Sequence, residues 1–146
     1  MIMDLSWTEI LLNLLHLLIA GLLSLPVAWD QEVESRGAGL RTFPLVAVAA
    51  CGYTLVGVNV LTSTDAEARV LQGIITGIGF IGGGAILKSR GSVHGTATAA
   101  SIWNTGLIGM AVAFNRYEIA IAMSLINLFL IRYVRRLKDS NGQSGE

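Results

Sequence analysis

Carboxylates gather directly after the first long apolar run of the chain, where Asp30, Glu32 and Glu34 are separated by single residues. If a helix continues through this segment, Asp30 and Glu34 share a face, because residues four apart lie on the same side of a helix. Mg²⁺ is often bound by one or two carboxylates while it keeps several waters. The cluster therefore admits a magnesium site, whereas ion pairs with the nearby Arg36 and Arg41 are the simpler interpretation.

A second charged cluster, Asp65, Glu67 and Arg69, precedes the third apolar run. Asp65 and Arg69 are four apart and can pair on one helix face. Asp65 also suits the amino terminus of a helix, where the helix dipole favours negative charge. If the chain carried ions, Asp30 and Asp65 would line the path, so both interpretations of the charged clusters stay open.

Polar side chains inside the apolar runs need a partner or a role, because polar groups are expensive in a membrane. Thr98, Ser101 and Thr105 recur at helical spacing in the fourth run, and His16 lies among leucines in the first. Hydrogen bonds between helices are the simpler interpretation of the hydroxyl groups, and a hydrated path is the alternative. For His16 the alternatives are a neutral, hydrogen-bonded ring and a proton relay.

The run from Gly73 to Gly84 is the most informative stretch. Gly77, Gly79 and Gly82 match the dinucleotide fingerprint G-x-G-x-x-G, which requires an acidic residue about 20 positions later to hold the ribose. After Glu67 the next acidic residue is Glu118, and a pyrophosphate would have to lie within an apolar run. The fingerprint therefore does not indicate nucleotide binding.

Glycine spacing instead indicates helix packing. The pairs Gly73 with Gly77 and Gly79 with Gly83 are each four apart. Such pairs form a shallow groove on one helix face, into which another backbone can pack closely in lipid. The alternative is that Gly82, Gly83 and Gly84 let the helix unwind, so that freed backbone groups line an ion site.

Catalytic constellations are not apparent. The two histidines lie in different regions, and the single cysteine, Cys51, lies in an apolar run, so neither a nucleophile–base pair nor a His/Cys metal cluster is visible. We therefore expect a protein that is not an enzyme and has no cofactor unless it binds Mg²⁺. Balanced charge, with a formal net charge of zero, also argues against a nucleic-acid partner.

The elements that position these residues are apolar. A soluble domain carries about 25% charged residues, whereas this chain has 14% charged and 53% hydrophobic residues. A membrane span needs about 20 mainly apolar residues. The sequence predicts an all-α fold, a polytopic transmembrane bundle of five short spans, of which the last is the shortest and could instead lie on the membrane surface: residues 10–29, 43–61, 70–87, 97–114 and 119–131.

The distribution of basic residues predicts how this bundle is oriented in the membrane. With the amino terminus outside, the inner segments hold eight Lys and Arg residues and the outer segments hold two, Arg69 and Arg116. Positive charge is retained on the cytoplasmic side, so we expect the amino terminus out and the carboxyl terminus in. The first run is expected to be retained as a span, because no basic residue precedes it as in a signal peptide. Residues 1–138 form one predicted transmembrane domain, and 139–146 a disordered tail.

Several motifs in this order resemble the MgtC/SapB family of bacterial inner-membrane proteins. The resemblance covers roughly residues 20–117 and rests on the Asp65…Arg69 pair and on three segments: Gly39-Leu-Arg-Thr42, Gly77-Ile-Gly-Phe-Ile-Gly82, and Val93-His-Gly-Thr-Ala-Thr-Ala-Ala-Ser-Ile-Trp103 followed by Gly109. It implies a five-span protein of the plasma membrane, linked to growth at low magnesium and to virulence. In well-known relatives the role is regulation of membrane complexes, including the ATP synthase and magnesium pumps.

Carried over by position, this resemblance implies functional residues at Asp30, Glu32, Arg41, Asp65, Arg69, Thr98, Trp103 and the segment from Gly77 to Gly84. The chain departs from the family at Gln31 and at His94, where a basic residue is usual, and we expect it to lack the soluble carboxyl-terminal domain of larger members. The leading hypothesis is a regulator that docks other membrane proteins, or copies of itself as a homo-oligomer, through Gly77 and Gly79. The rival is a small oligomeric transporter or channel for Mg²⁺ or protons.

Overall fold

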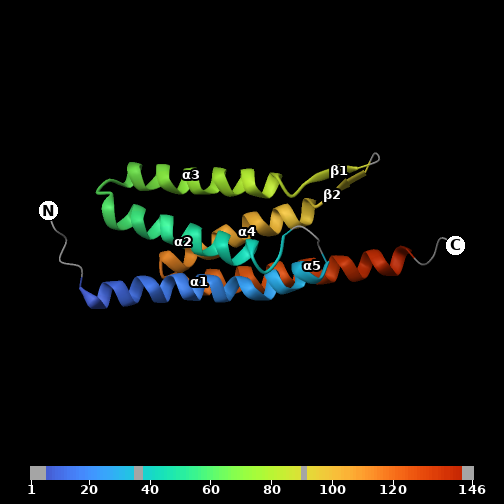
Figure 1. Ribbon diagram of the computed structural model, residues 1–146, viewed down its shortest axis with the longest axis horizontal. Helices are drawn as coiled ribbons and strands as arrows, with labels where there is room; N and C mark the ends of the chain where they lie inside the picture. Colours follow the sequence, from blue (N-terminus) through green and yellow to red (C-terminus); the bar gives the residue numbers. More distant parts are fainter. Residues whose placement is uncertain (1–5, 35–37, 90–91, 143–146) are drawn as a thin grey trace.

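The computed structural model describes residues 6–34, 38–89 and 92–142. In this part of the chain five helices lie roughly along one axis, with a short antiparallel hairpin between the third and fourth (Figure 1). The elements are α1 (Trp7–Glu34), α2 (Thr42–Val60), α3 (Thr64–Gly83), β1 (Leu87–Ser89), β2 (Ser92–His94), α4 (Thr96–Ala113) and α5 (Tyr117–Gly142). The prediction of an all-α fold is confirmed.

Local chemistry explains where the helices begin and end. Ser63 caps α3 by accepting a hydrogen bond from the backbone N–H of Ala66 at 3.3 Å, because the first amides of a helix lack partners within it. Gly95 precedes α4 with φ 85°, and a Cβ there would overlap the carbonyl oxygen of Ala85. Asn115 forms the turn between α4 and α5 in the left-handed conformation, with φ 57°.

α4 is the centre of the bundle and packs against the other four helices. Figure 1 shows α3 along one edge and α1 along the opposite edge, with α4 between them. Small residues allow this central position, because they let backbones approach closely. A Cβ on Gly109 of α4 would overlap the carbonyl oxygen of Ala47 on α2, and a Cβ on Gly82 of α3 would lie 2.9 Å from the carbonyl oxygen of Ala99 on α4.

The exterior is unusually apolar for a folded chain. Leu18 on α1, Leu45 on α2, Phe80 on α3 and Phe129 on α5 are all well over half exposed, with many other large apolar side chains. Soluble monomers rarely expose contiguous apolar surface on this scale. Among the described residues, α1 and α2 are each long and apolar enough to cross a membrane.

Several helices begin or end at other residues than the predicted spans. The third apolar run was expected to stay helical to Leu87, but α3 ends at Gly83 and the chain turns at Gly84 into the hairpin. α1 runs past its predicted end and includes Asp30 and Glu32. α5 reaches Gly142, so it contains the first residues of the predicted disordered tail, whereas residues 143–146 lie outside the described part of the chain.

Candidate functional site

A line of buried polar side chains follows the contact between α1, α4 and α5. We call it the polar seam: His16, Ser24, Asp30, Gln31, Ser101, Thr105, Ser124 and Asn127, each no more than 9% exposed. A buried polar group without a hydrogen bond is costly. Among the described residues, every buried side-chain nitrogen and oxygen has a partner, so the seam is a satisfied network.

Asp30 anchors the seam at the end of the bundle that carries the hairpin. Nε of Arg132, on α5, donates to Oδ1 of Asp30, on α1, at 2.9 Å. The Asp30 side chain is 7% exposed and that of Arg132 is 57% exposed. A buried carboxylate is stable only when a cation or hydrogen bonds compensate its lost hydration. The expected partners in sequence were Arg36 and Arg41, but the structure shows Arg132 as a partner, and Arg36 lies outside the described residues.

The two residues after Asp30 bind different elements. Gln31 accepts a hydrogen bond from the hydroxyl of Thr98, on α4, at 2.9 Å between Oγ1 and Oε1. Glu32 accepts one from the backbone N–H of Leu40, in the turn before α2, at 2.9 Å. Three consecutive residues of α1 therefore bind α5, α4 and the segment before α2. Sequence reasoning did not single out Gln31 as a contact between helices, although its departure from the family pattern was visible.

This arrangement bears on the magnesium hypothesis. Asp30 and Glu32 bind separate partners in different directions, and the side chain of Glu34 lies outside the described residues. Across the described part of the chain, no group of three His, Cys, Asp or Glu side chains could hold a metal ion. The two described carboxylates therefore do not converge on a shared cation site.

Hydroxyl and amide groups continue the seam through the middle of the bundle. Ser101 of α4 donates to Oδ1 of Asn127 on α5 at 3.0 Å, and the Asn127 amide donates back to the Ser101 carbonyl oxygen at 3.4 Å. Ser124 of α5 donates to the carbonyl oxygen of Leu23 on α1 at 2.6 Å. Thr105 bonds within α4, to the carbonyl oxygen of Ser101. The seam thus joins three helices by side-chain hydrogen bonds.

His16 lies at the opposite end of the seam. Its Nδ1 is 2.7 Å from the carbonyl oxygen of Leu12, which can only accept, so Nδ1 carries a proton. Its Nε2 lies 2.9 Å from Oδ1 of Asn115 and 3.2 Å from the hydroxyl of Tyr117. The ring also stacks on Tyr117, with centroids 6.2 Å apart. The structure therefore shows the His16 ring held by hydrogen-bond contacts to both of its nitrogens.

The remaining predicted polar residues lie away from the seam. Asp65 is exposed in the first turn of α3, and the structure records no ion pair between it and Arg69. Arg41 precedes α2 without a side-chain capping bond, and Trp103 of α4 is 53% exposed.

The glycines of α3 divide into two sets. Gly82 packs against α4, and Gly84 follows the end of the helix. At Gly73, Gly77, Gly79 and Gly83, by contrast, an added Cβ would meet no atom within 4 Å. The helix ends at Gly83, within the run, and the carbonyl oxygens of Gly82 and Gly83 accept hydrogen bonds from the backbone N–H groups of Ala85 and Ile86. The second set therefore leaves open surface on the bundle.

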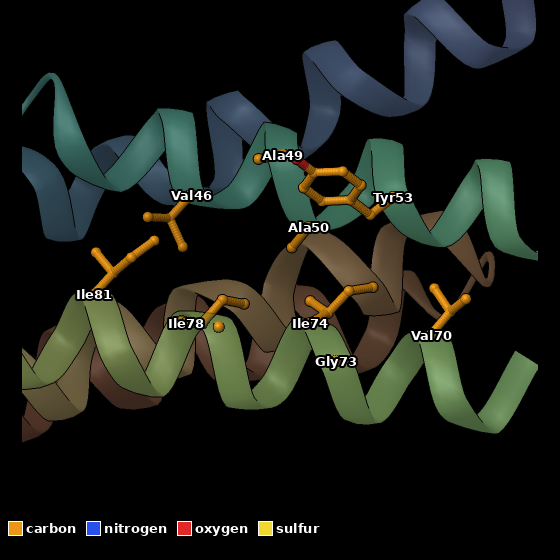
Figure 2. A pocket seen from close by; sticks show the side chains of 10 residues that line it. Val46, Ala49, Ala50, Tyr53, Val70, Gly73, Ile74, Ile78 and Ile81 are labelled. Carbon is orange, nitrogen blue, oxygen red and sulfur yellow. The ribbon is translucent and has the colours of Figure 1, made fainter.

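Part of this open surface is a groove of about 370 Å³ between α2 and α3. Figure 2 shows Ile74 and Ile78 of α3 projecting toward α2, with Tyr53 of α2 beside them. The lining is almost wholly apolar: Val46, Ala49, Ala50, Tyr53, Val70, Gly73, Ile74, Gly77, Ile78 and Ile81. A groove of this size and chemistry suits an aliphatic side chain or a helix, and not an ion.

A second cavity, of about 510 Å³, lies where the hairpin meets α2 and α4. Thr42, His94 and Thr98 are its polar lining residues. His94 is exposed, and its Nε2 lies 2.7 Å from the hydroxyl of Ser92 in the same strand. His94 thus belongs to strand β2 of the hairpin, and this contact lies within that strand.

Comparison with known proteins identifies the family to which the chain belongs. Residues 17–140 match the MgtC family. The chain is 36% identical over 115 residues to the MgtC protein of Salmonella typhimurium, covering 79% of this chain and 49% of that protein. It is 32% identical over 129 residues to SapB of Bacillus subtilis, covering 83% and 56%. It is 30% identical over 131 residues to YhiD of Escherichia coli K12, covering 85% and 61%.

YhiD is named as a candidate magnesium transporter. The chain spans about half to three-fifths of the length of these relatives. No solved structure matches it. The matched region contains all of α3 with its glycines and the whole polar seam except His16, so the residues described above lie on the part of the chain that the relatives share. This chain belongs to the MgtC family.

Proposed function

We propose that the chain is a five-span protein of the bacterial inner membrane that modulates other membrane protein complexes by helix packing, in the service of magnesium homeostasis and survival of stress. It performs no catalysis in this role. The observation that carries the proposal is the apolar groove between α2 and α3, where Gly73 and Gly77 leave the surface open.

Helix lengths and charges support five crossings. At about 1.5 Å per residue, the shortest helix, α4 with 18 residues, extends about 27 Å, close to the thickness of the hydrocarbon core. α1 begins at one end of the bundle and α5 ends at the other (Figure 1). Arg41 and Lys88 follow the ends of α1 and α3, and Arg132 lies in the second half of α5, toward the same end of the bundle, whereas Arg69 and Arg116 lie toward the opposite end. This distribution favours the amino terminus outside.

The groove suits a helix of another membrane protein. In lipid the hydrophobic effect does not drive helices together, so association depends on close van der Waals packing, and small residues make that packing possible. Gly73 and Gly77 lie four apart in the groove, and Val70, Ile74 and Ile81 offer branched side chains around them. The magnesium link rests on family membership and on the name of YhiD.

Substitution of the groove glycine tests this proposal. In cells whose own copy is deleted, Gly77→Leu should abolish the restoration of growth at low magnesium, because the added side chain fills the groove. The matched control is Ala122→Leu, which adds similar bulk on the exposed surface of α5. Both variants must reach the membrane in equal amounts. Growth of Gly77→Leu at the level of the control would overturn the docking role.

The polar seam favours a second candidate function, a small transporter for Mg²⁺ or protons. Buried ionisable groups within a membrane are expensive and mark transport paths in many proteins, and Asp30 and His16 lie at the two ends of the seam. Purified protein in liposomes would then carry Mg²⁺ or protons down an imposed gradient. Asp30→Asn should stop this flux, whereas the exposed Asp65→Asn should not. No flux under either gradient would exclude transport and leave docking as the function.

A further inference from the structure

α3 has an outward face that no described residue of this chain covers. Ile74, Ile78 and Gly82 are its buried residues and pack toward the bundle. A helix turns about 100° per residue, so the opposite side carries a different set, which we call the outward face: Asp65, Arg69, Gln72, Thr76, Gly79 and Gly83. All six are exposed.

This face is poorly suited to lipid. Gln72 lies eight residues into α3, about 12 Å along the helix, which is within the hydrocarbon if α3 spans the membrane as proposed above. Its side-chain amide has no hydrogen bond with any residue that the structure describes. An amide in hydrocarbon requires a partner. Gly79 and Gly83 beside it leave a surface without side chains, so a second helix can approach closely.

We propose that a second copy of this chain covers the outward face, with α3 packed against the partner's α3. Copies inserted in the same orientation are related by a two-fold axis along the membrane normal, so the two helices run parallel. Each residue then lies nearest its own copy, and a long side chain can also reach a residue one turn away on the partner's helix. Gln72 has both a donor and an acceptor, and it can therefore bond the partner's Gln72. Gly79 and Gly83 allow the backbones to approach.

Charge complementarity selects a second copy over another protein. Asp65 and Arg69 have opposite charge, lie one turn apart and are exposed on this face. Neither makes an ion pair with a residue that the structure describes. Across the two-fold axis the long side chain of each Arg69 can reach the partner's Asp65, one turn away, which gives two equivalent ion pairs. The outward face carries an acidic and a basic side chain one turn apart and an amide that can bond its own copy. It is therefore complementary to the same face of a second copy.

The outward face and the α2–α3 groove are separate surfaces. Gly77 lines the groove, and Gly79 is two residues further, about 200° around the helix. A dimer formed through the outward face therefore leaves the groove free for a partner helix. Self-association and partner docking can be disrupted independently.

Disulfide cross-linking in native membranes tests the dimer. The only cysteine, Cys51, is buried and is first replaced by alanine. Thr76→Cys then places a thiol on the outward face and keeps Gln72, and Ala122→Cys on α5 is the control. Oxidation should link two copies through Thr76→Cys with a yield about tenfold above the control. Equal yields, or a link from Thr76→Cys only to a different protein, would overturn the proposal.

Exchange of the charges at Asp65 and Arg69 provides a second test of the dimer. In the Thr76→Cys protein, Asp65→Arg should lower the yield of linked dimer about threefold to tenfold, and Asp65→Arg with Arg69→Asp should restore it. Dimer yields that do not differ between the single and the double variant would refute the ion pairs. A membrane-impermeant maleimide distinguishes failure of the proposed span from failure of the dimer. If the maleimide labels Thr76→Cys, the thiol is in contact with water and α3 does not span the membrane. If the thiol is neither labelled nor cross-linked, α3 spans the membrane but the dimer is absent.

Discussion

Nε of Arg132 on α5 donates to the carboxylate of Asp30 on α1 at 2.9 Å, which joins two helices through residues 102 positions apart. Only one side of this ion pair is shielded from solvent, because the Arg132 side chain is 57% exposed and that of Asp30 is 7% exposed. The arginine can find water or a lipid headgroup without Asp30. The carboxylate has far less access to solvent. The two partners therefore contribute differently to stability.

Removal of the arginine should destabilise the protein more than neutralisation of the acid. Arg132→Met removes the described ion pair of a buried carboxylate, and we expect a loss of about 2 kcal/mol in the free energy of unfolding. Asp30→Asn retains an acceptor for Arg132 and should cost about 1 kcal/mol. Thermal unfolding of purified protein in detergent measures both values. Equal losses in the two variants would mean that burial of Asp30 does not decide the energetics.

Gly109 should tolerate a methyl group far less than Gly73. A Cβ on Gly109 overlaps the carbonyl oxygen of Ala47, so Gly109→Ala must separate α4 from α2. We expect a cost of about 2 kcal/mol from this overpacking. Gly73→Ala meets no atom within 4 Å and should stabilise α3 by about 0.5 to 1 kcal/mol, because alanine favours the helix. Thermal unfolding distinguishes the two, and destabilisation by Gly73→Ala would contradict the open groove.

The sequence predicted the helices more accurately than their contacts. Long apolar runs and glycines four apart are local patterns, and they correctly indicated an all-α chain and open glycine surface on α3. The partner of Asp30 could not be found locally, because nearby arginines satisfy the same charge rule. Arg132 directly follows the last apolar run, so the sequence indicates only a basic residue at the end of that predicted span. A pairing over 102 positions depends on how α1 and α5 pack, which spacing does not encode.

The end of α3 was missed for a related reason. Gly84, Ala85 and Ile86 are apolar enough to continue a span, so hydropathy gave no signal of the turn at Gly84. The hairpin depends on a contact that hydropathy does not reveal: Gly95 has φ 85°, and its backbone lies against that of Ala85. Gln31 is a neutral residue between two acids, and nothing in the sequence indicates its partner. The structure places its Oε1 2.9 Å from the hydroxyl oxygen of Thr98.

Gln31 and Thr98 should show energetic coupling. Their hydrogen bond joins α1 to the start of α4, and Gln31 is 3% exposed. Gln31→Leu and Thr98→Val should each cost about 1 to 2 kcal/mol, because each leaves the other polar group with one partner fewer. The double variant should cost about 1 kcal/mol less than the sum of the single changes. Additive losses in a double-mutant cycle of thermal unfolding would mean that the two side chains do not interact in the membrane protein.

Asn115 combines a strained backbone with a side-chain contact, and two substitutions separate these contributions. Its φ is 57°, and its Oδ1 lies 2.9 Å from Nε2 of His16. Asn115→Ala loses the contact and places a less tolerant residue in the left-handed region, so we expect a loss of about 2 kcal/mol. Asn115→Gly loses the same contact without the strain and should cost about 1 kcal/mol less than alanine. If glycine and alanine were equally destabilising, the contact with His16 would account for the whole effect, and the left-handed turn would contribute nothing to the join between α4 and α5.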